Sequence, residues 1–193
     1  MKKIAVFCGS SNGASPIYLE GAKALGKELA KREIELIYGG SSIGLMGAVA
    51  DTILQEGGKA TGVLPNFLAE KEIAHKNLTD LIVVDSMHER KAKMAELADG
   101  FITLPGGAGT LEEFFEIYTW AQLGLHQKPC GILNINHYYD PLIRLIHHMA
   151  DAEFLQEKFR DMALVDANPE SLLEQFYTYT PPTVKIFLTE KQI

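Results

Sequence analysis

Short apolar runs alternate with longer stretches of helical periodicity along this chain. Each run is apolar at consecutive positions, which is typical of strands buried on both faces of a parallel sheet. The predicted strands are residues 4–8, 35–38, 60–64, 81–85, 100–104 and 130–134, with a weaker one at 163–165. The predicted helices are residues 15–32, 45–56, 87–98, 110–125, 141–150 and 169–177.

This order of elements predicts an α/β fold, a Rossmann-like, doubly wound, mostly parallel sheet with helices on both faces. No linker, low-complexity segment or repeat interrupts the pattern, so we expect residues 1–193 to form a single nucleotide-binding domain. In such a sheet the ligand binds beyond the carboxyl ends of the strands, where the strand order reverses.

Three of the predicted strand ends are rich in glycine and serine. They read Cys8-Gly9-Ser10-Ser11, Gly39-Gly40-Ser41-Ser42 and Pro105-Gly106-Gly107. Such residues let backbone N–H groups approach a ligand closely. One such turn is explained equally well by the geometry of a strand–helix connection, but three at one rim favour a binding site.

The common nucleotide motifs are missing from this rim. The first turn, Gly9 to Gly13, lacks the G-x-G-x-x-G spacing, and the second strand ends in Tyr38-Gly39 without an acid for a ribose diol. The sequence also has no G-x-x-x-x-G-K-[ST] motif. We therefore expect neither a hydride-transfer enzyme nor a P-loop NTPase, and no cofactor.

Composition narrows the partners and the compartment. A net charge of −7 argues against a general nucleic-acid or membrane-surface binder. No apolar stretch approaches the ~20 residues that span a bilayer. Cys8 and Cys130 lie in apolar stretches without a CxxC pair, which indicates buried free thiols in a reducing compartment. The six histidines show no metal-binding spacing. We expect a cytoplasmic protein without a bound metal.

The stretch TLPGGAGTLEEFFE, residues 103–116, combines a glycine-rich turn with a helix start. Free N–H groups at a helix N-terminus attract phosphate. Glu112 and Glu113 follow within about one helical turn, ~5.4 Å, which is close to the span from a 5′-phosphate to C1′ of a ribose. This spacing predicts a sugar phosphate or nucleotide that reacts at its anomeric carbon. Simple complementarity with the helix dipole, worth ~0.3–1 kcal/mol, is the alternative role for the glutamates.

A basic helix start lies upstream, at Asp85-Ser86-Met87-His88-Glu89-Arg90-Lys91. Ser86 and Glu89 have the spacing of a capping box. Arg90 and Lys91 then fall in the first turns near the ligand rim, where Arg offers a planar fork for phosphate or a ribose diol and Lys a point charge. A solvated helix face with i,i+4 pairs is the alternative interpretation.

Two motifs carry a family resemblance. PGGAGTLEE fits the pattern PGGxGTxxE, and MHERKAKM fits its upstream basic partner motif. Together they resemble the LOG (Lonely Guy) family, cytokinin riboside 5′-monophosphate phosphoribohydrolases that were formerly labelled lysine decarboxylase-like. The resemblance covers nearly the whole chain. We find no recognisable pyridoxal-phosphate site that would support the older label.

The resemblance implies hydrolysis of the N-glycosidic bond of an adenine-type nucleoside 5′-monophosphate, to free base and ribose 5-phosphate, by a homodimer. It implies Arg90 and Glu113 as the catalytic pair. We expect a contact between them to keep Glu113 ionised at neutral pH, because a nearby positive charge lowers the pKa of a carboxyl. The substrate-contacting positions that it implies are Glu72, Arg90, Lys91, Gly106, Gly107, Ala108, Gly109, Thr110, Leu111, Glu112 and Thr119.

A non-catalytic nucleotide or cofactor sensor or carrier of the same fold is the competing interpretation. A binder of a dianion gains nothing from a carboxylate beside it, so Arg90 together with Glu113 favours the enzyme. A transferase would use the same site with water excluded. The residues leave open the base specificity, AMP against N6-substituted adenine nucleotides, the physiological role and the general acid for the leaving base.

Overall fold

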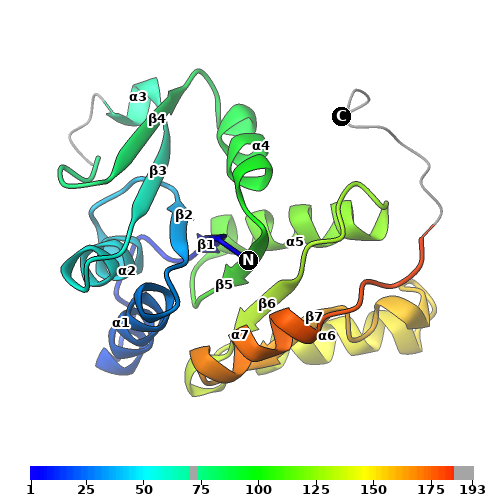
Figure 1. Ribbon diagram of the computed structural model, residues 1–193. Coiled ribbons are helices and arrows are strands. Elements are labelled where there is room, and N and C mark those ends of the chain that lie inside the picture. The colour runs from blue at the N-terminus through cyan, green and yellow to red at the C-terminus, as the bar shows by residue number, and fades with distance from the viewer. Residues whose placement is uncertain (70–73, 185–193) are drawn as a thin grey trace.

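The structure, a computed structural model, describes residues 1–69 and 74–184. Its seven strands form one sheet in the order β4-β3-β2-β1-β5-β6-β7, with β1 at the centre (Figure 1). Every neighbouring pair is parallel, so the sheet is wholly parallel rather than mostly so. All seven predicted strands are confirmed: β1 (Lys3–Phe7), β2 (Glu35–Tyr38), β3 (Ala60–Pro65), β4 (Asp80–Val84), β5 (Gly100–Thr103), β6 (Cys130–Leu133) and β7 (Ala163–Asp166).

The six predicted helices are also confirmed, with shifted ends. They are α1 (Pro16–Lys31), α2 (Gly44–Gln55), α4 (Met87–Leu97), α5 (Ala108–Gln122), α6 (Asp140–Asp151) and α7 (Pro169–Thr178). The single turns α3 (Asn66–Ala69), η1 (Ile135–His137) and η2 (Glu157–Phe159) were not predicted. Helix α5 ends three residues earlier than predicted, because Gly124 adopts a positive φ of 77° that the helix cannot continue through.

Helices cover both faces of the sheet, as predicted. On one face α1, α2 and α7 bury Leu25, Val49 and Leu173 against Ile4 and Leu36 of the central strands. The strand residues alternate between the faces, so their neighbours along the chain point to the opposite side.

On that opposite face the core is formed by α4, α5 and α6. Met94 and Ile117 pack with Phe101 of β5. Farther along the sheet, Phe114 of α5 and Ile146 of α6 belong to an apolar cluster with Ile132 of β6. Helices α4 and α5 therefore rest on the face of β1 and β5, which places their first turns at the carboxyl ends of these strands.

The strand order reverses between β1 and β5. The chain moves outward from β1 through β2 and β3 to β4, and then returns to pair β5 on the other side of β1. Backbone hydrogen bonds join the turns beyond these strands: Gly9 N–H donates to the Pro105 carbonyl at 3.0 Å, and Leu45 N–H donates to the Gly9 carbonyl at 3.1 Å. The turns after β1, β2 and β5 thus meet at the switch point, where a ligand is expected.

Gly44 is needed at the start of α2. Its φ of +61° is unfavourable for a residue with a side chain, and a Cβ there would clash with the backbone of Ser10. Gly57, after the same helix, has a φ of +80° with nothing within 4 Å of such a Cβ. A side chain would therefore strain the backbone at both positions, but only at Gly44 would it also clash with a neighbouring segment.

We expect Gly44→Ala to lower the free energy of unfolding by about 3 kcal/mol, the sum of left-handed strain and a backbone clash. The matched variant Gly57→Ala should lose about 1 kcal/mol, because it introduces the strain alone. Chemical denaturation of both variants measures the difference. If the two variants lose the same free energy of unfolding, Gly44 is not closely packed against the backbone of Ser10.

Candidate active site

A cavity of about 280 Å³ lies at the switch point. Its wall brings together the ends of β1 and β2 and the starts of α2, α4 and α5. The residues that line it are Val6, Phe7, Cys8, Gly9, Ser10, Gly39, Met46, Met87, Arg90, Gly107, Gly109, Thr110, Glu112 and Glu113. Segments from both halves of the chain therefore contribute to one site.

The glycine-rich turn opens α5 without a capping side chain. Gly107 is the N-cap of α5 and supplies no side-chain hydrogen bond, whereas Ser15, Ser86 and Asn168 cap α1, α4 and α7 with their side chains. The first N–H groups of a helix have no partner inside the helix. At α5 they remain for a ligand, together with the positive end of the helix dipole.

Arg90 is buried beside this turn with unused hydrogen-bonding capacity. Its Nη2 lies 3.6 Å from Oε1 of Glu113, and the two side chains are 11% and 13% exposed. Its Nη1 meets Met87 Sδ at 3.8 Å, and its Nε is buried without a partner. Gly39 makes room for the guanidinium, because a Cβ there would collide with it.

Burial raises the pKa of Glu113 from its ordinary 4.5 to about 7, although the charge of Arg90 works in the other direction. The expectation that Arg90 keeps this carboxyl fully ionised at neutral pH is therefore wrong. At 3.6 Å the pair is too long for a good hydrogen bond, so the attraction does not offset the loss of solvation.

Comparisons with known proteins identify the family of this chain. A family model described as "Possible lysine decarboxylase" matches residues 46–176. The probable cytokinin riboside 5′-monophosphate phosphoribohydrolase LOGL2 of Oryza sativa subsp. japonica is 43% identical over 185 residues, 96% of this chain and 76% of the relative. The cytokinin riboside 5′-monophosphate phosphoribohydrolase of Rhodococcoides fascians is 48% identical over 165 residues, 85% of this chain and 83% of the relative. The chain belongs to the LOG family.

A solved structure of low sequence identity shares the fold. The molybdenum cofactor binding protein of the phototrophic bacterium Rippkaea orientalis matches with a TM-score of 0.70 at 22% identity, covering 92% of this chain and 97% of that chain. The arrangement of seven parallel strands and flanking helices is therefore common to proteins with different ligands, and the site residues must carry the functional argument.

Of the positions that the LOG resemblance implies, Arg90, Gly107, Gly109, Thr110, Glu112 and Glu113 line the cavity. Lys91 pairs instead with two carboxylates of α5, Glu112 at 2.5 Å and Glu116 at 3.0 Å. Burial acts to lower the pKa of Lys91, but these hydrogen bonds outweigh it and raise the pKa. Lys91 thus ties α4 to α5, and its charge is compensated before any phosphate binds.

Five other predicted positions lie differently. Gly106 and Ala108 belong to the glycine-rich turn but are not among the residues that line the cavity. Leu111 is half-buried and packs with the apolar cluster of α5 and α6. Thr119 is exposed about two turns farther along α5, away from the residues that line the cavity. Glu72 lies outside the described residues.

Sequence reasoning missed the methionines of this cavity. Met46 and Met87 line it but were not singled out as ligand contacts, whereas Gly9, Ser10 and Gly39 lie in the glycine-rich strand ends that the sequence marked. The methionines carry no such signal, because an apolar helix residue is more simply explained by the core.

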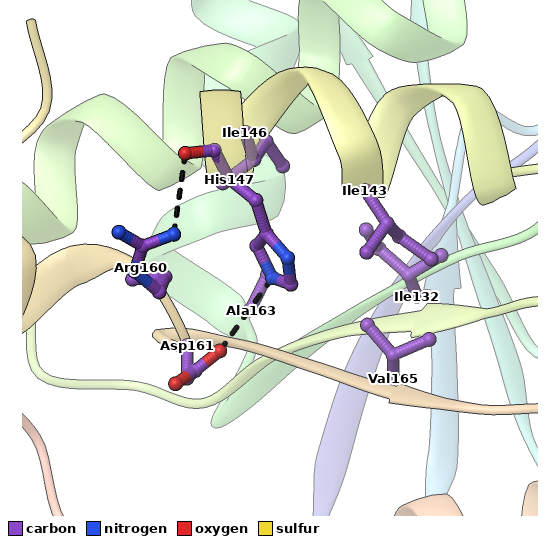
Figure 2. A pocket seen from close by; sticks show the side chains of 8 residues that line it. All are labelled: Ile132, Ile143, Ile146, His147, Arg160, Asp161, Ala163 and Val165. Atoms are coloured by element: carbon purple, nitrogen blue, oxygen red, sulfur yellow. Dashed lines mark hydrogen bonds and ion pairs between the residues drawn. The ribbon is translucent and has the colours of Figure 1, made fainter. Parts of the chain in front are cut away.

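A second cavity, of about 290 Å³, lies between α6 and the strands β6 and β7 (Figure 2). Its floor is apolar, and its polar groups are already paired. His147 Nε2 lies 3.6 Å from Asp161 Oδ1, and Arg160 donates to the His147 carbonyl at 3.3 Å and to Asp151 at 2.7 Å. None of the predicted site residues reaches this cavity. Among the residues that the structure describes, this second cavity therefore offers no unpaired polar group of the kind found at the switch point.

In the part of the chain that the structure describes, no group of three or more His, Cys, Asp or Glu side chains is placed to hold a metal ion. Among the helices of residues 1–69 and 74–184, none has the length and apolar character needed to cross a membrane.

The raised pKa of Glu113 predicts a pH-dependent stability. Below pH 4.5 the carboxyl is protonated in both states, and between pH 4.5 and about 7 it ionises in the unfolded chain first. The folded state therefore loses stability as the pH rises through this window. Because Glu113→Gln stays neutral, we expect its unfolding free energy relative to wild type to rise by about 3 kcal/mol from pH 4.5 to pH 8.

Urea denaturation at several pH values measures this difference. The control is Glu112→Gln, which removes an exposed carboxylate that pairs with Lys91. The free energy of unfolding of that variant should fall by up to about 1 kcal/mol, and its difference from wild type should not rise at high pH. A difference between Glu113→Gln and wild type that does not vary with pH would mean that Glu113 is not buried as a proton-binding group.

Proposed function

We propose that this protein hydrolyses the N-glycosidic bond of an adenine-type nucleoside 5′-monophosphate, a cytokinin riboside 5′-monophosphate, AMP or both, to free base and ribose 5-phosphate. The observation that carries the proposal is the buried Arg90–Glu113 pair beside the glycine-rich start of α5. The LOG relatives of rice and of Rhodococcoides fascians are named for this activity on cytokinin nucleotides.

The start of α5 provides the phosphate site. Gly107, Gly109 and Thr110 of this uncapped helix start line the cavity, and the first N–H groups of a helix bind phosphate well. The buried, unpaired Nε of Arg90 supplies a further donor and a positive charge. A phosphate monoester would thus accept hydrogen bonds from donors that have no partner within the described part of the protein.

The carboxylate of Glu113 then falls near the anomeric carbon. Glu113 lies five residues after the first residue of α5, about 7.5 Å along the helix axis. This span suits a ribose held by its 5′-phosphate at the helix start, with the carboxylate beyond its C1′. Cleavage at C1′ passes through an oxocarbenium-like state, which a nearby carboxylate stabilises. A protein that only stored the dianion would lose affinity through the same carboxylate, which supports an enzyme rather than a carrier.

In the reaction the C1′–N bond breaks with its electron pair on the base, and water adds to C1′. The water loses one proton and the leaving base gains one, so the step needs a group that exchanges protons near neutral pH. Glu113, with a pKa of about 7, has this property as the base that activates water. Arg90 orients Glu113 and the ribose phosphate.

We expect purified protein to release free base from AMP, from N6-isopentenyl-AMP or from both, and to act poorly on adenosine because the phosphate contacts are lost. Glu113→Gln should lower kcat by about 100-fold or more with little change in substrate affinity. Chromatography of the free base after incubation with AMP, N6-isopentenyl-AMP, GMP and CMP measures these rates.

The matched control is Glu174→Gln on α7, an exposed carboxylate that pairs with Arg32 on the other face of the sheet. It should retain wild-type activity. An active Glu113→Gln variant would remove Glu113 from the mechanism. No base from any nucleotide, with nucleotide binding intact, would overturn hydrolysis in favour of a sensor or carrier.

We also propose that the protein is a homodimer that pairs through α4 and α5. A groove of about 690 Å³ runs between these helices next to the active site, and it carries Ala92, Trp120 and Leu125 among its lining residues. Trp120 and Leu125 are half-buried, and a second copy would remove their apolar surface from water.

Light scattering should give wild-type protein a mass of twice 21.3 kDa. Ala92 is exposed in this groove, so Ala92→Arg should add a charge to the interface without disturbing the core, and should give monomers. Ala24→Arg, at an exposed position of α1, is the control and should stay dimeric. A monomeric wild type would contradict the dimer.

A further inference from the structure

Two adjacent tyrosines after β6 bind the turn that opens α5. Tyr138 donates its hydroxyl hydrogen to the Gly106 carbonyl at 2.7 Å, and Tyr139 donates to the Leu104 carbonyl, also at 2.7 Å. The carbonyl between them, that of Pro105, accepts from a backbone N–H of the first turn. Three consecutive carbonyls of the turn are therefore paired with other segments of the fold.

The bond to Gly106 orients the peptide plane that precedes the N-cap. In a trans peptide the C=O and the following N–H point in opposite directions. Tyr138 thus turns the N–H of Gly107 away from itself, and Gly107 lines the active-site cavity. A carbonyl turned into the cavity would repel phosphate, whereas an N–H group would bind it.

The segment before the tyrosines is strained and held by side chains. Asn136 and His137 both have left-handed φ values, 51° and 59°, which are unfavourable for residues with a side chain. Asn134 holds the next turn: its Oδ1 accepts from Tyr139 N–H at 2.7 Å, and its Nδ2 donates to Asp140 at 2.8 Å. Strain of this kind persists where the surrounding structure enforces one conformation, often at functional sites.

Tyr138 differs from its neighbour in exposure. Tyr139 is buried in the core of α6, whereas Tyr138 is 41% exposed. The ring of Tyr138 packs edge-on against Tyr18 of α1 and against Tyr139, with centroids 5.7 and 4.9 Å apart. These ring contacts do not need the hydroxyl. The hydroxyl of Tyr138 can therefore be removed without emptying the core.

We propose that Tyr138 is a positioning residue for a phosphate monoester. Its hydroxyl holds the Gly106 peptide so that the N–H groups of residues 107–110 face the cavity. The proposal rests on the proposed function in that the ligand is a nucleoside 5′-monophosphate. Its test uses ribose 5-phosphate, which binds without being cleaved, so it does not depend on catalysis.

Tyr138→Phe should weaken the binding of ribose 5-phosphate by about five- to tenfold, because the N–H groups of the turn are no longer held toward the phosphate. The binding of adenosine, which has no phosphate, should not change. The KM for the nucleotide substrate should rise by a similar factor, with kcat and the unfolding midpoint unaltered. Isothermal titration with ribose 5-phosphate and with adenosine gives the binding constants. Tyr177→Phe, a half-exposed tyrosine of α7 over Arg32, is the matched control and should bind both ligands like wild type.

Each result decides the role of Tyr138. Equal ribose 5-phosphate affinity in Tyr138→Phe and wild type would overturn it, and so would a wild type that does not bind ribose 5-phosphate. Equal weakening of ribose 5-phosphate and adenosine would assign Tyr138 a general structural role instead. Wild type that binds ribose 5-phosphate but releases no base would overturn the proposed function, while the comparison with Tyr138→Phe still tests the positioning role.

Discussion

A buried guanidinium with incomplete hydrogen bonding is the constraint on which this site depends. Arg90 lies in the space that Gly39 leaves free, and its Nε has no partner. A buried charge is costly unless it is paired. The carboxylate that pairs with it, Glu113, is 3.6 Å away and itself binds protons with a pKa of about 7. Neither group is fully satisfied by the other, and in the proposed function this leaves both for the nucleotide.

The turn at the start of α5 is organised from outside. Its carbonyls are bound by the first turn and by Tyr138 and Tyr139, while its helix has no side-chain cap. Donors that are fixed before the ligand arrives need no reorganisation when it binds. The rigid sheet supplies these partners, because the turns after β1, β2 and β5 emerge at the point where the strand order reverses.

The fold was predictable because burial on both faces leaves a direct trace in the chain: uninterrupted apolar runs for strands and a 3.6-residue period for helices. The misses were local. The single turn α3 is too short to show a period, and the end of α5 depends on the positive φ of Gly124. The lining of the candidate cavity was predictable where a motif marked it, as at Arg90, Glu113 and the glycine turn. The hydrogen bond of Tyr138 carries no motif of its own.

The sequence by itself determined the α/β class, the order of the elements, the rim of the sheet that carries the site and the pairing of a basic helix start with an acidic one. Only the tertiary structure decided how these charges are used. Lys91, a candidate phosphate ligand by position, is compensated by Glu112 and Glu116, whereas Arg90 is left with a free Nε. The protonation of Glu113 was also decided there, because desolvation and charge pairing depend on distances between residues far apart in the chain.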